Sequence, residues 1–455
     1  MISRFLSVRT RGVAAYYQYM RLVKAATMKK IIKRVSRPFV MLIFLLSISQ
    51  VSFGYSVLTH QAIIDSAWDN SIKPLVLKRF PDATAEQLKD AHAYTYGGAI
   101  IQDMGYYPFG SKFFSDLTHY VRSGDFIEAL IAESRDINEY AFALGALAHY
   151  AADNSGHPIA VNKAVPVAYP KLRAKYGEEV TYAEDPSAHI KTEFGFDVLQ
   201  VARGRYAPES YHDFIGFKVS KDVLSRAFKK TYGLELKDVF KSVDLAFGSF
   251  RLAVSTIIPE ATRVAWETKK DEIEKLTPGI AREKFVYNLS RASYEKEWGK
   301  DYEKPGFFAK TMAYLFRVVP KVGPFKAVAF KPPTPETEKM FQDSFDATMD
   351  RYRALLAQAG SGHVDLENKD FDTGKQTRAG EYKLADKTYA EWLDKLEDDN
   401  FKTVTPEVRA DLLAFYSDLN APIATKSKKG EWRELLQDLA KLKAIQAEPA
   451  QTTQR

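Results

Sequence analysis

Residues Tyr140–Pro158, YAFALGALAHYAADNSGHP, combine a strongly apolar run with three ionisable side chains. The run of Ala, Leu and Phe predicts an α-helix, and a helix this apolar is normally buried. His149 and Asp153 are four residues apart and therefore share one face of that helix. A buried ionised carboxylate is costly unless it is paired or binds a metal. With His157, the segment fits either part of a zinc ligand set or a core His–Asp pair beside an unrelated loop histidine.

The composition of the rest of the chain limits what such a site can contain. The 455 residues are 45% hydrophobic, enough for one large domain or two. Residues 1–54 hold ten Lys or Arg and no acidic residue, so the remainder carries 55 basic and 58 acidic side chains, a formal net charge of −3. This nearly neutral body predicts no stable binding of nucleic acid. The chain has no cysteine, so a transition-metal site must use His, Asp, Glu or backbone groups.

The N-terminal segment, residues 1–54, has the pattern of an export signal. Basic residues from Lys29 to Arg37 precede an apolar run, Phe39–Ile48, and Ser52-Phe53-Gly54 supplies the small residues that a signal peptidase recognises. The run is short for a permanent membrane anchor. We therefore expect an exported protein, periplasmic or secreted, whose mature chain begins at Tyr55.

Cleavage after Gly54 would place a free α-amino group five residues before His60. Such an amine, once deprotonated, chelates a metal together with its own carbonyl oxygen. A precursor lacks that ligand, because its nitrogen belongs to a peptide bond. The alternative for His60 is a position near the N-terminus of a helix through Gln61–Asn70.

Further candidate ligands follow along the chain. Asp103 lies in GGAIIQDMG, where glycines flank the carboxylate; such a residue is also typical of a turn or a cap. His119 has aromatic neighbours and is equally compatible with a core histidine. His189 and Glu193 repeat the spacing of four residues and fit either one metal ion or a surface pair. The other histidines, His92, His212 and His363, are interpreted as background.

The ordered set of these residues resembles a known family. Tyr55, His60, Asp103, His119, His149-x3-Asp153, His157 and His189-x3-Glu193 together look like the zinc-dependent phospholipase C family, to which the zinc-dependent single-strand nucleases are more distantly similar. GALAHYAADNSGHP is similar to the family's signature helix and GGAIIQDMG to its aspartate segment. The resemblance covers roughly residues 55–200 and implies an all-α, multi-helix phospholipase C/nuclease-like domain with up to three zinc ions.

The resemblance also implies an assignment of ligands. Asp103, His119 and His149 would hold one zinc ion, and Asp153 would bridge it to a second. The amine and carbonyl of Tyr55, with His60, would complete the second site. His157, His189 and Glu193 would hold the third ion.

The sequence departs from the family pattern in three places. Three residues separate Asp153 from His157, where the family usually has five. The connection to His189 is longer than in compact phospholipases, and Tyr55 replaces the usual tryptophan.

The implied activity is hydrolysis of a phosphoric ester by metal-activated water, with a phospholipid as the expected substrate. Asp103 is the candidate proton acceptor for that water as well as a ligand. A single-strand nuclease or another phosphodiesterase on the same metals is the first alternative. A non-catalytic helical surface protein is the second. No protein partner is implied.

The remaining chain predicts a helical extension over residues 266–446, after a zinc domain over residues 55–265, with a disordered tail at 447–455. Helical spacing of apolar residues recurs in several segments: Val223–Glu267, Pro335–Ala359, Leu384–Leu396, Pro406–Leu419 and Gly430–Ile445. Phe307–Lys331 is aromatic and basic, and fits peripheral membrane contact or, more commonly, ordinary core and loop. Gly360–Gly380 is polar and compatible with a linker.

Overall fold

The computed structural model describes residues 57–107, 109–202, 216–252 and 330–445, with a few more between 266 and 279. Within these ranges the chain forms helices and no β-strand, which confirms the predicted all-α class. Residues 1–54, Tyr55, most of Phe307–Lys331 and the predicted tail lie outside them. The predicted domain boundary at 265/266 falls where only scattered residues are described.

The helices up to residue 202 supply every described candidate ligand. They are α2 (Val57–Ala67), η1 (Trp68–Ile72), α3 (Lys73–Arg79), α4 (Ala85–Gly98), η2 (Gln102–Tyr106), α5 (Lys112–Tyr120), α6 (Ser123–Ala132), α7 (Ile137–Gly156), η3 (His157–Val161), α8 (Asn162–Ala168), α9 (Pro170–Tyr176) and α10 (Pro186–Ala202). Among them η1 and η3 are π-helical, and η2 is a 3₁₀ turn.

The helices after residue 216 are those of the predicted extension and of the segment before it. They are α12 (Lys221–Tyr232), α13 (Leu236–Val239), α14 (Val243–Leu252), α19 (Pro335–Ser361), α20 (Lys383–Glu397), α21 (Pro406–Phe415), η6 (Ala424–Ser427) and α22 (Lys429–Ala444). The last four α-helices match the predicted segments closely. The predicted segment Val223–Glu267 is interrupted, because Gly233 ends α12 in the left-handed conformation with φ +68°.

Helix α7 contains the apolar segment Tyr140–Gly156 and is the central element of the site. The Asp136 side chain caps its first turn by accepting hydrogen bonds from the backbone N–H groups of Asn138 and Glu139, at 2.8 and 2.9 Å. Every residue from Glu139 to Gly156 is buried. The helix is therefore surrounded on all sides, as its nearly continuous apolar sequence predicts.

Helix α4 approaches α7 at two glycines. A Cβ atom on Gly98 would lie 2.0 Å from the Phe142 carbonyl oxygen, and one on Gly145 would lie 2.0 Å from the Thr95 carbonyl oxygen. Only glycine permits so close a contact between backbones. The contact brings the chain that follows α4, including the Ala99 carbonyl group, beside the His149 ring.

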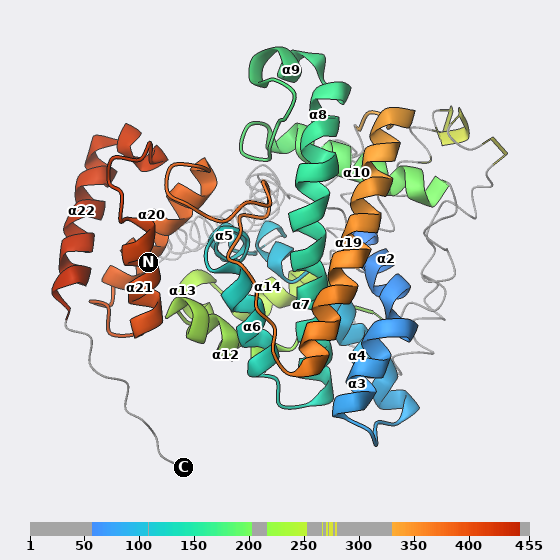
Figure 1. Cartoon of the computed structure of the whole chain (residues 1–455), viewed down its shortest axis with the longest axis horizontal. Coiled ribbons are helices and arrows are strands. Elements are labelled where there is room, and N and C mark those ends of the chain that lie inside the picture. The colour runs from blue at the N-terminus through green and yellow to red at the C-terminus, as the bar shows by residue number, and fades with distance from the viewer. Residues whose placement is uncertain are drawn as a thin grey trace, which may run out of the picture. The chain divides into compact units, whose positions relative to one another are not determined.

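Helix α19 packs along α7, although about 200 residues separate the two helices in sequence (Figure 1). Thr334 caps α19 and Pro335 occupies its first turn, as both residues favour. The buried Tyr352 hydroxyl donates a hydrogen bond of 2.9 Å to the Leu144 carbonyl oxygen of α7. The extension is thus joined to the helix that carries His149 and Asp153.

Residues 362–382, here called the strap, connect α19 to α20 and lie against the same helices. The Phe371 backbone N–H donates to the His119 carbonyl oxygen at 3.1 Å, and the Tyr150 hydroxyl donates to the Glu367 carbonyl oxygen at 2.8 Å. Gly374 has φ +68°, and a Cβ atom there would lie 2.8 Å from the Asn154 carbonyl oxygen. The interpretation of Gly360–Gly380 as a linker is therefore wrong, because the backbone of this segment is bound to α5 and α7.

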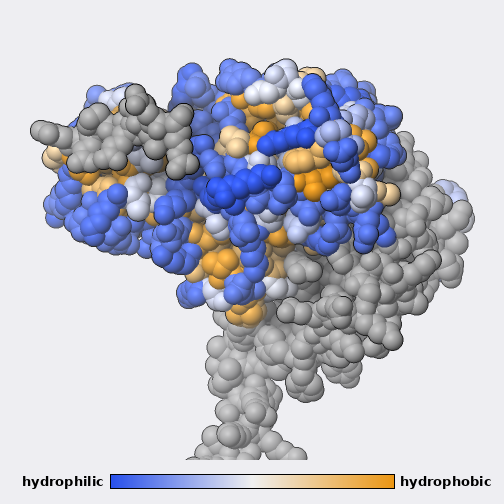
Figure 2. Space-filling view, turned by 90° about the horizontal axis from the view of Figure 1, so that it is seen from below, coloured by the Kyte–Doolittle hydropathy of each residue, from blue (hydrophilic) through white to orange (hydrophobic). Residues whose placement is uncertain are grey.

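On the face shown in Figure 2, the described residues form a largely hydrophilic surface with separate apolar patches. Among the helices that the structure describes, none is both long and apolar enough to cross a membrane. Peripheral contact with a membrane remains a prediction from the sequence.

Candidate metal centre

Helix α7 places its two ionisable side chains at the middle of a buried polar cluster. His149 and Asp153 have no exposed surface, and His149 Nε2 lies 3.1 Å from Asp153 Oδ2. The same oxygen is 3.6 Å from His119 Nε2, whereas Asp153 Oδ1 is 3.5 Å from His60 Nε2. The two oxygens of one carboxylate therefore face different histidines.

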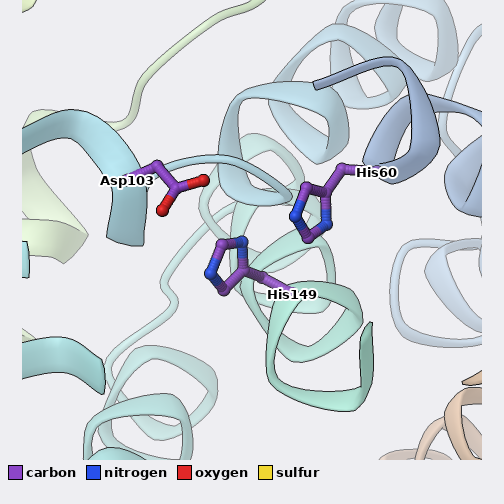
Figure 3. Close-up of side chains that lie close together, drawn as sticks. All are labelled: His60, Asp103 and His149. Carbon is purple, nitrogen blue, oxygen red and sulfur yellow. The ribbon is translucent and has the colours of Figure 1, made fainter. Parts of the chain in front are cut away.

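Three further elements complete this cluster. His60 comes from the first turn of α2, Asp103 from the 3₁₀ turn η2, and His119 from the last turn of α5. Figure 3 shows the side chains of His60, Asp103 and His149 directed towards one another. Asp103 Oδ1 lies 3.4 Å from His119 Nε2. Donor atoms of His60, Asp103 and His149 all lie within 4.8 Å of one another, as do those of His119, His149 and Asp153.

Backbone carbonyl groups orient two of these imidazoles. His119 Nδ1 is 2.7 Å from the Ser115 carbonyl oxygen, one turn earlier on α5. His149 Nδ1 is 3.0 Å from the Ala99 carbonyl oxygen, which the close contact of α4 and α7 supplies. A carbonyl oxygen only accepts, so each Nδ1 carries a proton and each Nε2 is directed into the cluster.

A second cluster lies one turn further along the chain. His157 is the first residue of the π-helical turn η3, and His189 and Glu193 share one face of α10. Glu193 Oε1 lies 2.8 Å from His189 Nδ1 and 3.5 Å from His157 Nε2. Donor atoms of all three residues lie within 4.8 Å of one another. The short spacing between Asp153 and His157 is thus compatible with convergence of these three side chains.

Burial and neighbouring charges shift the pKa values of the side chains in these clusters in opposite directions. Burial opposes a charge on His119, but the carboxylates of Asp103 and Asp153 outweigh it and raise the pKa of His119 to about 10. Burial, reinforced by His149, lowers the pKa of His60 to about 3. Burial also favours protonation of Asp153, yet the neighbouring His149 and His157 imidazoles hold its pKa well below its usual range. An ionised Asp153 with no exposed surface requires compensating positive charge.

The donor set fits zinc. Neither carboxylate oxygen of Asp153 or of Glu193 accepts a hydrogen bond, although all four atoms are buried. Buried polar groups normally have such partners, and a coordinated cation is one way to satisfy them. Imidazole nitrogens and carboxylate oxygens without thiolates suit zinc, and the Nδ1 contacts orient the rings for it. Eight of the nine predicted ligands are brought together in these groups, and the ninth, Tyr55, lies outside the described residues.

The predicted background histidines are placed elsewhere where they are described. His92 stacks on Trp68 with ring centroids 3.8 Å apart, and His363 lines a cavity between α3, α6 and α19. His212 lies outside the described ranges.

Sequence reasoning missed Asp372, a buried carboxylate of the strap. Its Oδ1 atom lies 3.2 Å from His157 Nδ1. It also missed Asn162, whose side-chain oxygen is 3.0 Å from His189 Nε2. No motif surrounds either residue, and Asp372 is more than 200 positions from the histidine that it faces. Their contacts with His157 and His189 can be identified only in the folded structure.

One comparison with known proteins agrees with this geometry. The family model described as zinc-dependent phospholipase C matches residues 59–242. That range contains all eight of the converging donors and excludes the strap. No curated protein and no solved structure matches the chain. Residues 59–242 therefore match the zinc-dependent phospholipase C family, and this family domain supports a zinc-dependent hydrolase of the phosphodiesterase type.

Proposed function

We propose that this protein is an exported phospholipase C that cleaves phospholipid headgroups by means of zinc-activated water. Asp153 carries the proposal, because one of its oxygens faces His149 and His119 and the other faces His60, at 3.1–3.6 Å. A carboxylate so placed is suited to bridge two cations. Asp103, His119, His149 and Asp153 are the proposed ligands of one zinc ion, and Asp153, His60 and the Tyr55 amine and carbonyl those of a second. His157, His189 and Glu193 are proposed to hold a third.

Zinc ions held by these residues would neutralise a phosphodiester, lower the pKa of a bound water and stabilise the leaving oxygen. The side chains of this protein would position the zinc ions and the attacking water. Asp103 Oδ1 accepts no hydrogen bond and lies 3.4 Å from His119 Nε2. We assign to Asp103 the additional role of accepting the proton of the attacking water. The Phe371 ring, with its centroid 5.2 Å from that of His119, helps to exclude bulk water from the ligands.

The substrate class is tested by comparing two phosphodiesters under identical conditions. We expect the purified mature protein to release phosphocholine from phosphatidylcholine in mixed micelles, and a chelator to abolish that release. Single-stranded DNA is the matched substrate for the alternative activity. Cleavage of the DNA with no attack on the phospholipid would assign the centre to a nuclease, and a protein that binds no zinc would be a non-catalytic helical protein.

The N-terminal ligand gives a prediction about maturation. Tyr55 precedes the first described residue, Val57, by two positions, and His60 Nε2 already faces Asp153 at 3.5 Å. We expect a chain with extra residues before Tyr55 to bind one zinc ion fewer than the mature chain, because its nitrogen there is an amide. It should also unfold at a lower temperature in the presence of zinc, since bound metal stabilises the folded state.

A removable N-terminal tag provides the measurement, and the same tag at the C-terminus is the control. Protease treatment should restore the missing zinc only in the N-terminally tagged chain. N-terminal sequencing of the exported protein is the direct check. A mature end several residues away from Tyr55, in a protein with its full zinc content, would show that the amine is not a ligand.

A further inference from the structure

The strap supports the cluster of His157, His189 and Glu193 from outside the family domain. The Asp372 side chain is buried, and its Oδ1 atom lies 3.2 Å from His157 Nδ1. On the other side of the ring, His157 Nε2 faces Glu193 Oε1 at 3.5 Å. The His157 imidazole therefore lies between the two carboxylates, and Asp372 contacts the ring nitrogen that does not face Glu193.

The Asp372 carboxylate is itself held in place by two hydroxyl groups. The Tyr120 hydroxyl of α5 donates to Asp372 Oδ2 at 2.9 Å, and the Tyr382 hydroxyl of the strap donates to the same atom. All three side chains are buried. Because the second oxygen is engaged in this way, the first remains directed at His157.

Asp372 also reaches the second histidine of the cluster, through its backbone. The Asn162 side-chain nitrogen donates to the Asp372 carbonyl oxygen at 2.7 Å. The Asn162 side-chain oxygen lies 3.0 Å from His189 Nε2. This leaves His189 Nδ1 to face Glu193, at 2.8 Å. One residue of the strap thus orients both imidazoles.

Charge gives a second reason for a carboxylate at this position. The cluster offers a zinc ion two neutral imidazoles and one carboxylate, which leaves one positive charge uncompensated in a buried site. Asp372 supplies the missing negative charge without being a ligand, since the imidazole ring separates it from the donor atoms.

We propose that Asp372 is a positioning residue for the third zinc ion, so that this site is completed by the strap and not by the family domain alone. The proposal rests on the proposed three-zinc function. A carboxylate against the outer nitrogen of a ligating histidine fixes the ring and raises its basicity, and loss of such a partner typically weakens metal binding by about 10–100-fold.

The test measures the affinity of each zinc ion in the full chain by competition with a chromophoric chelator. We expect Asp372→Ala to weaken one of three ions by about 10–100-fold and to leave the other two unchanged. Asp372→Asn retains an acceptor but not the charge, and should weaken the same ion less. Tyr382→Phe should weaken the same ion by a smaller factor, because it removes one of the two hydroxyl groups that donate to Asp372 Oδ2.

Asp370→Asn is the matched control, in the same strap. Asp370 is buried, and its Oδ1 accepts from the Thr373 backbone N–H at 2.8 Å, a bond that an asparagine side chain also makes. The Asp370→Asn variant should bind three zinc ions with wild-type affinity. If Asp372→Ala does not fold, the comparison of Asp372→Asn with Asp370→Asn decides the question.

Wild-type affinity for all three ions in the Asp372 variants would overturn the inference while leaving the proposed function intact. Equal weakening of all three ions would also overturn it, because that result indicates a general structural role. A wild-type protein that binds no zinc would overturn the proposed function and this inference together.

Discussion

Replacing Asp153 with asparagine is expected to remove at least one zinc ion and to lower kcat/KM by about 10³-fold or more, equivalent to about 4 kcal/mol of transition-state stabilisation. The substitution preserves the shape of the side chain but removes the charge that two cations would share. An amide also presents one oxygen and one NH₂ group, so it cannot place an oxygen atom on both the His60 side and the His149 side. Asp153 is fully buried within α7, and that helix should persist in the variant.

Asp136→Asn is the matched control for this experiment, since it makes the same substitution on the same helix. Asp136 caps α7, and asparagine caps helices about as well as aspartate. The control should therefore keep its zinc, its activity and its helical circular dichroism. Metal analysis and kinetics of both variants give the comparison. Full zinc content and wild-type turnover in Asp153→Asn would reject the bridging role.

Removal of zinc from the wild-type protein should abolish activity and lower the unfolding temperature substantially. The two clusters bury eight ionisable or metal-ligating side chains, and the Asp153 and Glu193 oxygens accept no hydrogen bond. A site filled at a free zinc concentration about 1,000-fold above its dissociation constant stabilises the fold by about 4 kcal/mol. For a mature chain of about 400 residues, that figure corresponds to about 5 °C in Tm for each site.

Calorimetry with and without a chelator measures this effect. Addition of zinc should restore both the unfolding temperature and the activity, whereas the same concentration of magnesium, which prefers oxygen ligands, should restore neither. A chelated protein that unfolds at the same temperature as the zinc-loaded protein would show that the clusters do not bind metal in the folded state.

Much of the candidate site was predictable because helical periodicity is local. The spacing of four residues places His149 beside Asp153 and His189 beside Glu193, whatever the rest of the chain does. The apolar sequence around the first pair predicts its burial, and the structure has α7 buried from Glu139 to Gly156. The convergence of His60, Asp103 and His119 was expected only by resemblance to a family, because no local rule brings together residues from separate helices.

The contact of Asp372 with the second cluster was not predictable, for a physical reason. Asp372 lies in a polar loop whose composition also suits a linker, and its position depends on long-range contacts with Tyr120, His157 and Asn162. A sequence pattern indicates which residues share a helix face, but not which loop packs over it. Outside the family domain, the strap could be placed only by the fold itself.

Anomalous diffraction at the zinc absorption edge, from crystals of the purified mature protein, tests the central claim most directly. We expect three peaks: one among Asp103, His119, His149 and Asp153, a second between Asp153 and His60, and a third among His157, His189 and Glu193. Zinc–nitrogen distances should be about 2.0–2.1 Å. A zinc-replete crystal with no peak within coordination distance of Asp153 would contradict the account.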